Sequence, residues 1–127
     1  MRHRKGYRAL SRNTNQRKAL LKGLAVSLFE HKRITTTLTK AKELRRYAER
    51  LITHAKKQTP ASHRIIFSKL QNKEIVKLLM NEYAEKYKER PGGYTRIVKK
   101  GRRLGDQAEM CFIELVDYDH FVPPESE

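Results

Sequence analysis

An apolar stripe at helical spacing between residues 41 and 55 constrains the fold of this chain more than any other feature. Its members recur mostly at intervals of three or four residues: Ala41, Leu44, Ala48, Leu51, Ile52 and Ala55. This spacing places them on one face of a helix, and that face must pack against other elements to leave water. The stripe therefore predicts an amphipathic helix, running to about Lys57, at the centre of a small folded unit.

A helix and a strand are expected before this central helix. Asn13 can cap a helix whose third residue, Gln16, reaches back to it. That helix has one apolar side, made of Leu20, Leu21, Leu24, Ala25, Leu28 and Phe29. Residues 33–38 then alternate, with Ile34, Thr36 and Leu38 on one side, which predicts a strand. We expect Thr39 to cap the central helix.

Two more helices and two strands are expected after it. Thr59-Pro60 supplies a cap and a first helical residue, and Asn72 starts a further helix. The expected inward residues are Ile65, Ile66, Phe67 and Leu70 in the first of these helices, and Ile75, Val76, Leu79, Met80, Tyr83 and Tyr87 in the second. Arg90-Pro91-Gly92-Gly93 ends the helical region. Residues 94–99 and 110–117 are predicted strands, joined by a glycine-bracketed basic loop at 100–106.

The order helix, strand, three helices, two strands predicts an α+β fold of two layers, with a small sheet covered by helices on one side. At 127 residues we expect one domain, residues 13–117. Residues 1–12 lack an apolar period and are expected to form an extended basic arm. Residues 118–127 contain acids but no Lys or Arg, and are expected to form a flexible acidic tail.

The composition excludes several classes of protein. Cys111 is the single cysteine, so neither a disulfide framework nor a multi-cysteine zinc site is expected, and its place in a predicted strand indicates a buried apolar residue. The histidines are scattered, and His54 is expected on the surface. No apolar run approaches the ~20 residues of a membrane span, and no secretory leader is expected; a mitochondrial transit segment is less favoured but open. We expect no enzyme, no metal and no cofactor.

The net charge of +15 calls for a polyanionic partner, with nucleic acid first and an anionic membrane surface second. Within residues 1–33 the only acid is Glu30. Candidate contacts there are Arg2, His3, Arg4, Lys5, Arg8, Arg12, Arg17, Lys18 and Lys22. The outer side of the central helix adds Lys40, Lys42, Arg45, Arg46 and Arg50, although Glu43 and Glu49 make an ordinary charged face an alternative there. A third group is Tyr94, Arg96, Lys99, Lys100, Arg102 and Arg103. The glycines at 101 and 105 would let this loop approach phosphate closely.

No DNA-reading motif and no aromatic RNA-binding strand motif is present. An irregular basic surface with an arm suits a folded RNA better than a uniform duplex. A DNA-binding nucleoid or transcription protein is the runner-up, and an RNA-modifying enzyme is third, because no acid–base constellation occurs.

Several motifs in this order resemble ribosomal protein seventeen of the bacterial large subunit. They are Met1-Arg2-His3-Arg4-Lys5, Arg17-Lys18-Ala19, Lys40-Ala41-Lys42-Glu43-Leu44-Arg45, Leu51-Ile52-Thr53, Gly92-Gly93-Tyr94-Thr95-Arg96-Ile97, and Gly105-Asp106 followed by Ile113-Glu114-Leu115-Val116. The resemblance implies a non-catalytic structural protein of the bacterial cytoplasm without a cofactor. It also implies binding to large-subunit ribosomal RNA near the peptide exit side, neighbouring ribosomal proteins as partners, and the same order of elements. Two departures are Thr39, where proline is common, and a tail that runs past the usual end.

Overall fold

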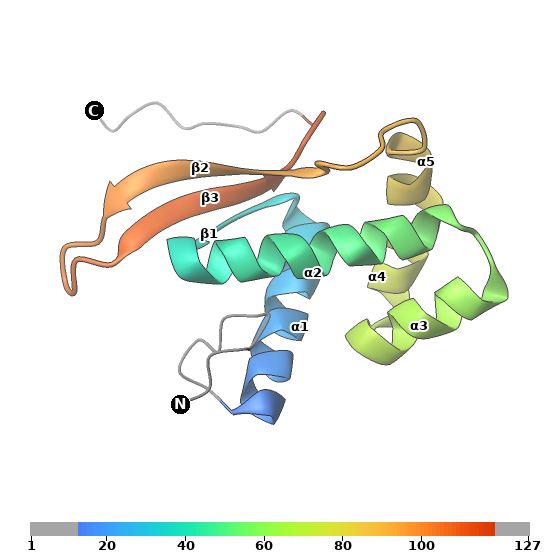
Figure 1. Ribbon diagram of the computed structural model, residues 1–127, viewed down its shortest axis with the longest axis horizontal. Coiled ribbons are helices and arrows are strands. Elements are labelled where there is room, and N and C mark those ends of the chain that lie inside the picture. The colour runs from blue at the N-terminus through green and yellow to red at the C-terminus, as the bar shows by residue number, and fades with distance from the viewer. Residues whose placement is uncertain (1–12, 119–127) are drawn as a thin grey trace.

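The computed structural model describes residues 13–118 (Figure 1). Expectations for the arm and for residues 119–127 lie outside this range. The elements follow as α1 (Thr14–His31), β1 (Arg33–Thr37), α2 (Leu38–Lys56), α3 (Pro60–Leu70), α4 (Lys73–Leu78), η1 (Leu79–Tyr83), α5 (Ala84–Lys86), β2 (Thr95–Arg102) and β3 (Glu109–Leu115). The last predicted helix is thus α4, η1 and α5, interrupted by a π-helical turn. The α+β class and the order of elements are confirmed.

The strands form an antiparallel sheet in the order β1-β3-β2. Ile34 of β1 and Ile97 of β2 both pair with Ile113 of β3, so one face collects the apolar side chains. Helix α2 packs along this face against all three strands, and α3 lies on the side of α2 away from the sheet (Figure 1). Helix α1 contacts α2 and also β1 and β3. The hairpin of β2 and β3 extends past the start of α2, and its tip is clear of the helices.

Local capping sets the helix starts. Asn13 Oδ1 accepts from the Gln16 backbone N–H at 2.8 Å, and Asn13 N–H donates back to Gln16 Oε1 at 3.3 Å. This is the predicted reciprocal cap. Thr59 with Pro60, and Asn72, cap α3 and α4 as expected. The prediction for Thr39 was wrong: Thr37 is the last extended residue, and its Oγ1 accepts from Lys40 N–H at 3.5 Å. Strand β1 therefore passes into α2 without a loop, and Leu38 is helical.

The core lies between the sheet and the helices. All six residues of the predicted α2 stripe are at most 1% exposed. Tyr83 OH donates to the Phe29 carbonyl, and Tyr87 OH donates to the Val116 carbonyl at 2.7 Å, so both buried phenols are satisfied. Cys111 is fully buried, as predicted, and burial raises the pKa of its thiol.

Two expectations about burial were wrong. In α3 the inward residues are Ser62, Ile66 and Leu70, spaced by four, while Ile65 and Phe67 are 39% and 37% exposed. Helix α3 thus presents a narrower stripe to α2 than its apolar run suggested. His54 is half-buried rather than on the surface, and its Nδ1 has no hydrogen-bond partner among residues 13–118.

Candidate nucleic-acid interface

A cleft of about 560 Å³ opens between α1, α2 and the end of α3. Its walls come from segments that are far apart in the sequence. The lining residues are Asn15, Arg17, Lys18, Ala19, Leu21 and Lys22 from α1, Tyr47 and Arg50 from α2, and Ser68, Lys69 and Gln71 from the end of α3. Four of the predicted contact residues, Arg17, Lys18, Lys22 and Arg50, therefore meet in one place.

Two side-chain contacts join the walls of the cleft. Tyr47 OH donates to the Lys69 carbonyl at 3.4 Å, which ties α2 to α3. Lys22 Nζ donates to Gln71 Oε1 at 3.0 Å, which ties α1 to the residue that caps α3. Gln71 is in the left-handed conformation, with φ of 52°, and its N–H donates to the Phe67 carbonyl. Burial raises the pKa of Tyr47, so its phenol stays protonated at neutral pH.

The charge in this cleft is of one sign. Arg17, Lys18, Lys22, Arg50 and Lys69 line it, and no Asp or Glu is among its lining residues within the described chain. A concave surface between protein walls concentrates such a field and attracts anions. The start of α1 adds to it, because the first turn carries no acid to offset the positive end of the helix. Lys69 was missed by sequence reasoning, because nothing local indicates that α3 ends beside α1.

The other predicted residues of α2 are divided between two sides of the helix. Glu49 accepts from Thr95 N–H at 3.2 Å and from Thr95 Oγ1 at 3.0 Å, so this side of α2 faces β2. Lys42 and Arg45 share the side of Glu49 by helical spacing. Arg46 pairs with the buried carboxylate of Glu43 at 3.4 Å. Lys40 is half-buried in the first turn. The helix is therefore not one uniform basic face.

The second basic region is the β2–β3 hairpin. The predicted boundaries of its loop, residues 100–106, were wrong. Strand β2 continues to Arg102, with a register shift between Lys99 and Gly101. Gly101 has φ of 114°, which L side chains rarely adopt, and it lets the strand resume after the irregularity. Lys99, Lys100 and Arg102 are therefore strand residues, and the turn is shorter than expected.

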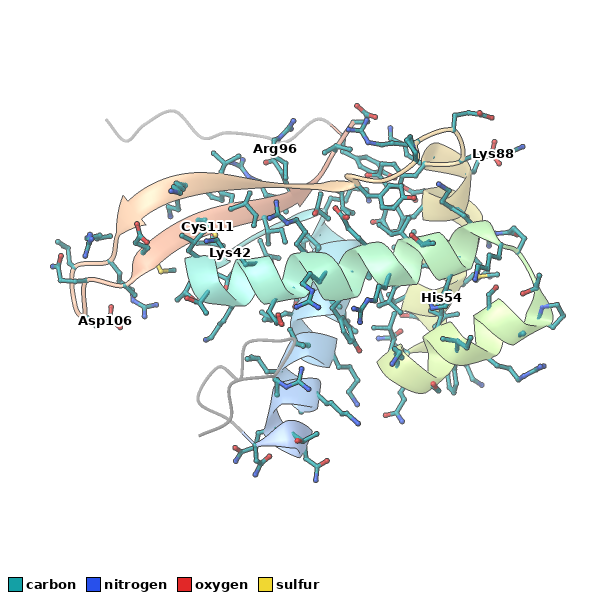
Figure 2. The ribbon with its side chains drawn as sticks, viewed as in Figure 1. Lys42, His54, Lys88, Arg96, Asp106 and Cys111 are labelled. Carbon is teal, nitrogen blue, oxygen red and sulfur yellow. The ribbon has the colours of Figure 1, made fainter. Side chains whose placement is uncertain are left out.

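At the tip of the hairpin, Arg103 forms a bidentate ion pair with Asp106. The Nε–Oδ1 distance is 3.0 Å and the Nη2–Oδ2 distance is 2.8 Å. Asp106 Oδ1 also accepts from Ala108 N–H at 3.1 Å. The hydrogen bond from Arg103 holds the pKa of Asp106 well below its usual range, and the pair raises the pKa of Arg103. Figure 2 shows Asp106 at the end of the hairpin. Arg103, one of the predicted contact residues, is therefore already paired within the protein.

On the outer face of the sheet, Arg96, another of the predicted cations, forms an ion pair with an acidic residue. Glu114 of β3 is buried between Arg33 Nε at 3.2 Å and Arg96 Nη2 at 2.7 Å. The register explains this, because Arg33 and Arg96 are the cross-strand partners of Glu114. Two residues before Glu114 in β3, the ring of Phe112 has the Arg33 guanidinium 3.8 Å from its centroid and Lys100 Nζ at 5.0 Å. Sequence reasoning did not single out Glu114 as a partner of these arginines.

Residues 20–116 match the family model described as "Ribosomal protein L17". The chain belongs to this family. It is 56% identical over 119 residues to "Large ribosomal subunit protein bL17" of Phocaeicola vulgatus, an alignment that covers 94% of this chain and 74% of the relative. The protein of the same name from Porphyromonas gingivalis gives the same values, and that from Amoebophilus asiaticus is 54% identical over 127 residues, covering 100% of this chain and 66% of the relative.

Membership of the L17 family confirms that the chain is a structural ribosomal protein and not an enzyme. Within residues 13–118 no group of three or more His, Cys, Asp or Glu residues is placed to hold a metal ion. None of the helices in that range is long and apolar enough to cross a membrane.

Tyr94 belongs to the L17 motif quoted above, but the structure buries it. Its side chain is 2% exposed, its OH accepts from Lys56 Nζ at 2.8 Å, and its ring centroid lies 5.2 Å from that of Tyr87. We remove Tyr94 from the candidate contacts, because a residue enclosed in this way cannot stack on a base. The predicted contacts of the arm, Arg2, His3, Arg4, Lys5, Arg8 and Arg12, lie outside the described residues.

Proposed function

We propose that this chain is a structural constituent of the large ribosomal subunit that binds and stabilises large-subunit ribosomal RNA by neutralising its phosphates. The relatives named as large-subunit proteins support the assembly. The observation that carries the RNA contact is the cleft between α1, α2 and α3, where five cations meet without a carboxylate among the described lining residues. Bound Lys and Arg side chains displace condensed counterions from RNA, which supplies most of the affinity.

The hairpin provides a second contact at a distance from the cleft. It extends past α2 (Figure 1), and Lys99 and Arg102 lie exposed along β2. A projecting pair of strands can reach between RNA helices that the helical part of the protein cannot approach. We extend the proposal to neighbouring large-subunit proteins as partners, to a place near the peptide exit side, and to a bacterial cytoplasmic ribosome, all of which rest on the family resemblance.

The first test is sedimentation of a lysate that contains the tagged chain through a sucrose gradient. We expect the chain to travel with large subunits and to stay with them through a high-salt wash. Recovery as free protein, or with the nucleoid, would overturn the proposal and favour a DNA-binding role.

The second test is binding of the purified chain to large-subunit RNA in a salt series. If about six to ten phosphates are contacted, affinity should fall about 10³–10⁵-fold between 50 and 200 mM salt. Duplex DNA of equal length is the matched competitor, and we expect it to displace the RNA poorly. A nearly flat salt dependence would contradict a mechanism based on phosphate neutralisation.

A further inference from the structure

The cleft has more volume than contact with phosphates requires. Phosphates on the outside of an RNA helix can be met by cations on a convex surface, without any recess. The volume of about 560 Å³ instead falls in the usual range of pockets that enclose a small ligand. The recess is therefore large enough for a ligand group to enter it.

The walls of the cleft are chemically divided. Tyr47 is half-buried and supplies apolar surface to the recess, while Leu21, which also lines it, is 4% exposed and adds little. Lys18, Arg50 and Lys69 are exposed and surround it with positive charge. A nucleotide has the matching division, because its base is a flat and weakly polar ring system and its phosphate is an anion.

Two neutral polar side chains complete the match. Gln71 Oε1 accepts from Lys22, so the amide N–H groups of Gln71 are oriented as donors. Ser68 Oγ donates to the Ile65 carbonyl at 3.1 Å, so this oxygen presents lone pairs as an acceptor. Both residues line the cleft. A donor and an acceptor at one wall are what the hydrogen-bonding edge of a base requires.

We infer that the cleft between α1, α2 and α3 takes one unpaired nucleotide of the bound RNA, with its base against Tyr47 and its phosphates among Lys18, Arg50 and Lys69. This rests on the proposed RNA-binding function and specifies the RNA that the cleft selects. In a double-stranded RNA the bases are stacked inside the helix, so a duplex contacts the basic rim but leaves the recess empty. The protein therefore prefers a loop or bulge to a continuous duplex.

The first test compares two RNA hairpins of equal length and charge, one with an unpaired loop of several nucleotides and one closed by a minimal loop. The full chain is used at one fixed salt concentration. We expect about tenfold tighter binding to the open loop, since stacking of one base on an aromatic side chain contributes on that order. Equal affinity for the two hairpins would overturn the inference while the proposed function stands. Failure to bind either RNA at low salt would overturn the proposed function itself.

Variants of Tyr47 sharpen this test. Tyr47→Leu should abolish the preference for the open loop, and Tyr47→Phe should retain it, because the ring and not the hydroxyl meets the base. The matched control is Tyr118→Leu, which also removes a half-buried tyrosine, but one that donates to Glu82 away from the cleft. The control should keep the preference. Loss of the preference in Tyr118→Leu but not in Tyr47→Leu would overturn the inference.

A photochemical measurement on the unsubstituted chain does not depend on how the variants fold. An RNA with 4-thiouridine at each unpaired position in turn is irradiated with the protein bound, and the modified peptide is identified by mass spectrometry. We expect one position to give an adduct on Tyr47. Adducts confined to the hairpin, for example on Phe112, with binding intact, would place the unpaired nucleotide elsewhere and overturn the inference.

Discussion

The cleft and the β2–β3 hairpin each carry five basic side chains, but their surroundings differ. Of the hairpin cations, Arg96 pairs with Glu114, Arg103 pairs with Asp106, and Lys100 lies over Phe112. The cations of the cleft are Arg17, Lys18, Lys22, Arg50 and Lys69, and they share it with no described carboxylate. A count of charges in the sequence ranks the two regions as equals. The structure shows that part of the hairpin's charge is already compensated within the protein.

This difference predicts that RNA affinity depends more on the cleft than on the hairpin. A variant with Lys18, Lys22, Arg50 and Lys69 all replaced by Ala should lose about 10²–10³-fold in affinity at 0.1 M salt, because each lost phosphate contact removes roughly 0.7 from the salt slope. None of the four is buried, so folding should survive. Filter binding over a salt series, with circular dichroism beside it, measures both effects.

The matched control removes the same number of charges from elsewhere. Lys57, Lys73, Lys77 and Lys88 are exposed and outside the cleft. Their replacement by Ala should weaken binding much less than the cleft variant does. Equal losses in the two variants would show that net charge alone matters and would remove the distinction between the regions.

The second prediction concerns stability, and it tests whether Arg96 serves the fold. Glu114→Gln removes the buried negative charge that faces Arg33 and Arg96. The Glu114 side chain is 7% exposed, that of Arg33 is 16% exposed and that of Arg96 is 55% exposed. Removing one partner of a buried pair costs about 3–5 kcal/mol. Because about half of the Arg96 side chain is exposed to water, we expect Glu114→Gln to lower the free energy of unfolding by a smaller amount, about 2–3 kcal/mol. Urea unfolding checks this, and an unchanged midpoint would show that the arginines do not need their carboxylate.

The third prediction is a smaller loss of affinity from the hairpin. Replacing Lys99, Lys100 and Arg102 by Ala should lower the salt slope by about one, and affinity about tenfold at 0.1 M salt, less than three full phosphate contacts would give, since Lys100 lies over Phe112. The three side chains are exposed, so the melting temperature should stay close to that of the parent. If this variant lost more affinity than the cleft variant, the hairpin would be the principal contact.

The features that the sequence predicted well depend on neighbouring residues. The reciprocal cap of Asn13 and Gln16, the Thr59-Pro60 start and the α2 stripe are all set within one or two helical turns. The expected cap at Thr39 was wrong because strand and helix abut, and Thr37 and Thr39, two residues apart, are locally equivalent candidates for the cap. The pair of Arg103 and Asp106 is also local, because the two residues are three apart in the sequence. A search for oppositely charged residues at this spacing would have predicted it.

The features that the sequence could not predict are tertiary. Tyr47, Lys69 and Gln71 reach the cleft only because α3 ends beside α1 and α2, and no local pattern encodes that approach. Tyr94 stands in a basic segment and was predicted as a contact, but Tyr87 and Lys56 enclose it. The pairing of Arg96 with Glu114 depends on strand register, which was not fixed before the structure.

The last prediction adds charge to the hairpin instead of removing it. Asp106→Asn keeps an oxygen that can accept from Ala108 N–H but no longer neutralises Arg103, so the shape of the tip should persist while one cation becomes available. RNA affinity should rise by at most about fivefold at 0.1 M salt, the value of one added phosphate contact.

Since Arg103 keeps the pKa of Asp106 well below its usual range, this carboxylate is ionised at neutral and mildly acidic pH alike. The ratio of the two affinities should therefore stay constant between pH values of about 5 and 8. The control is Asp117→Asn, which frees Arg90, a residue of the loop between α5 and β2 that belongs neither to the hairpin tip nor to the lining of the cleft, and it should leave affinity unchanged. An Asp106→Asn variant that binds no better than the parent would show that the hairpin tip does not touch RNA, and that the hairpin's contribution comes from β2 alone.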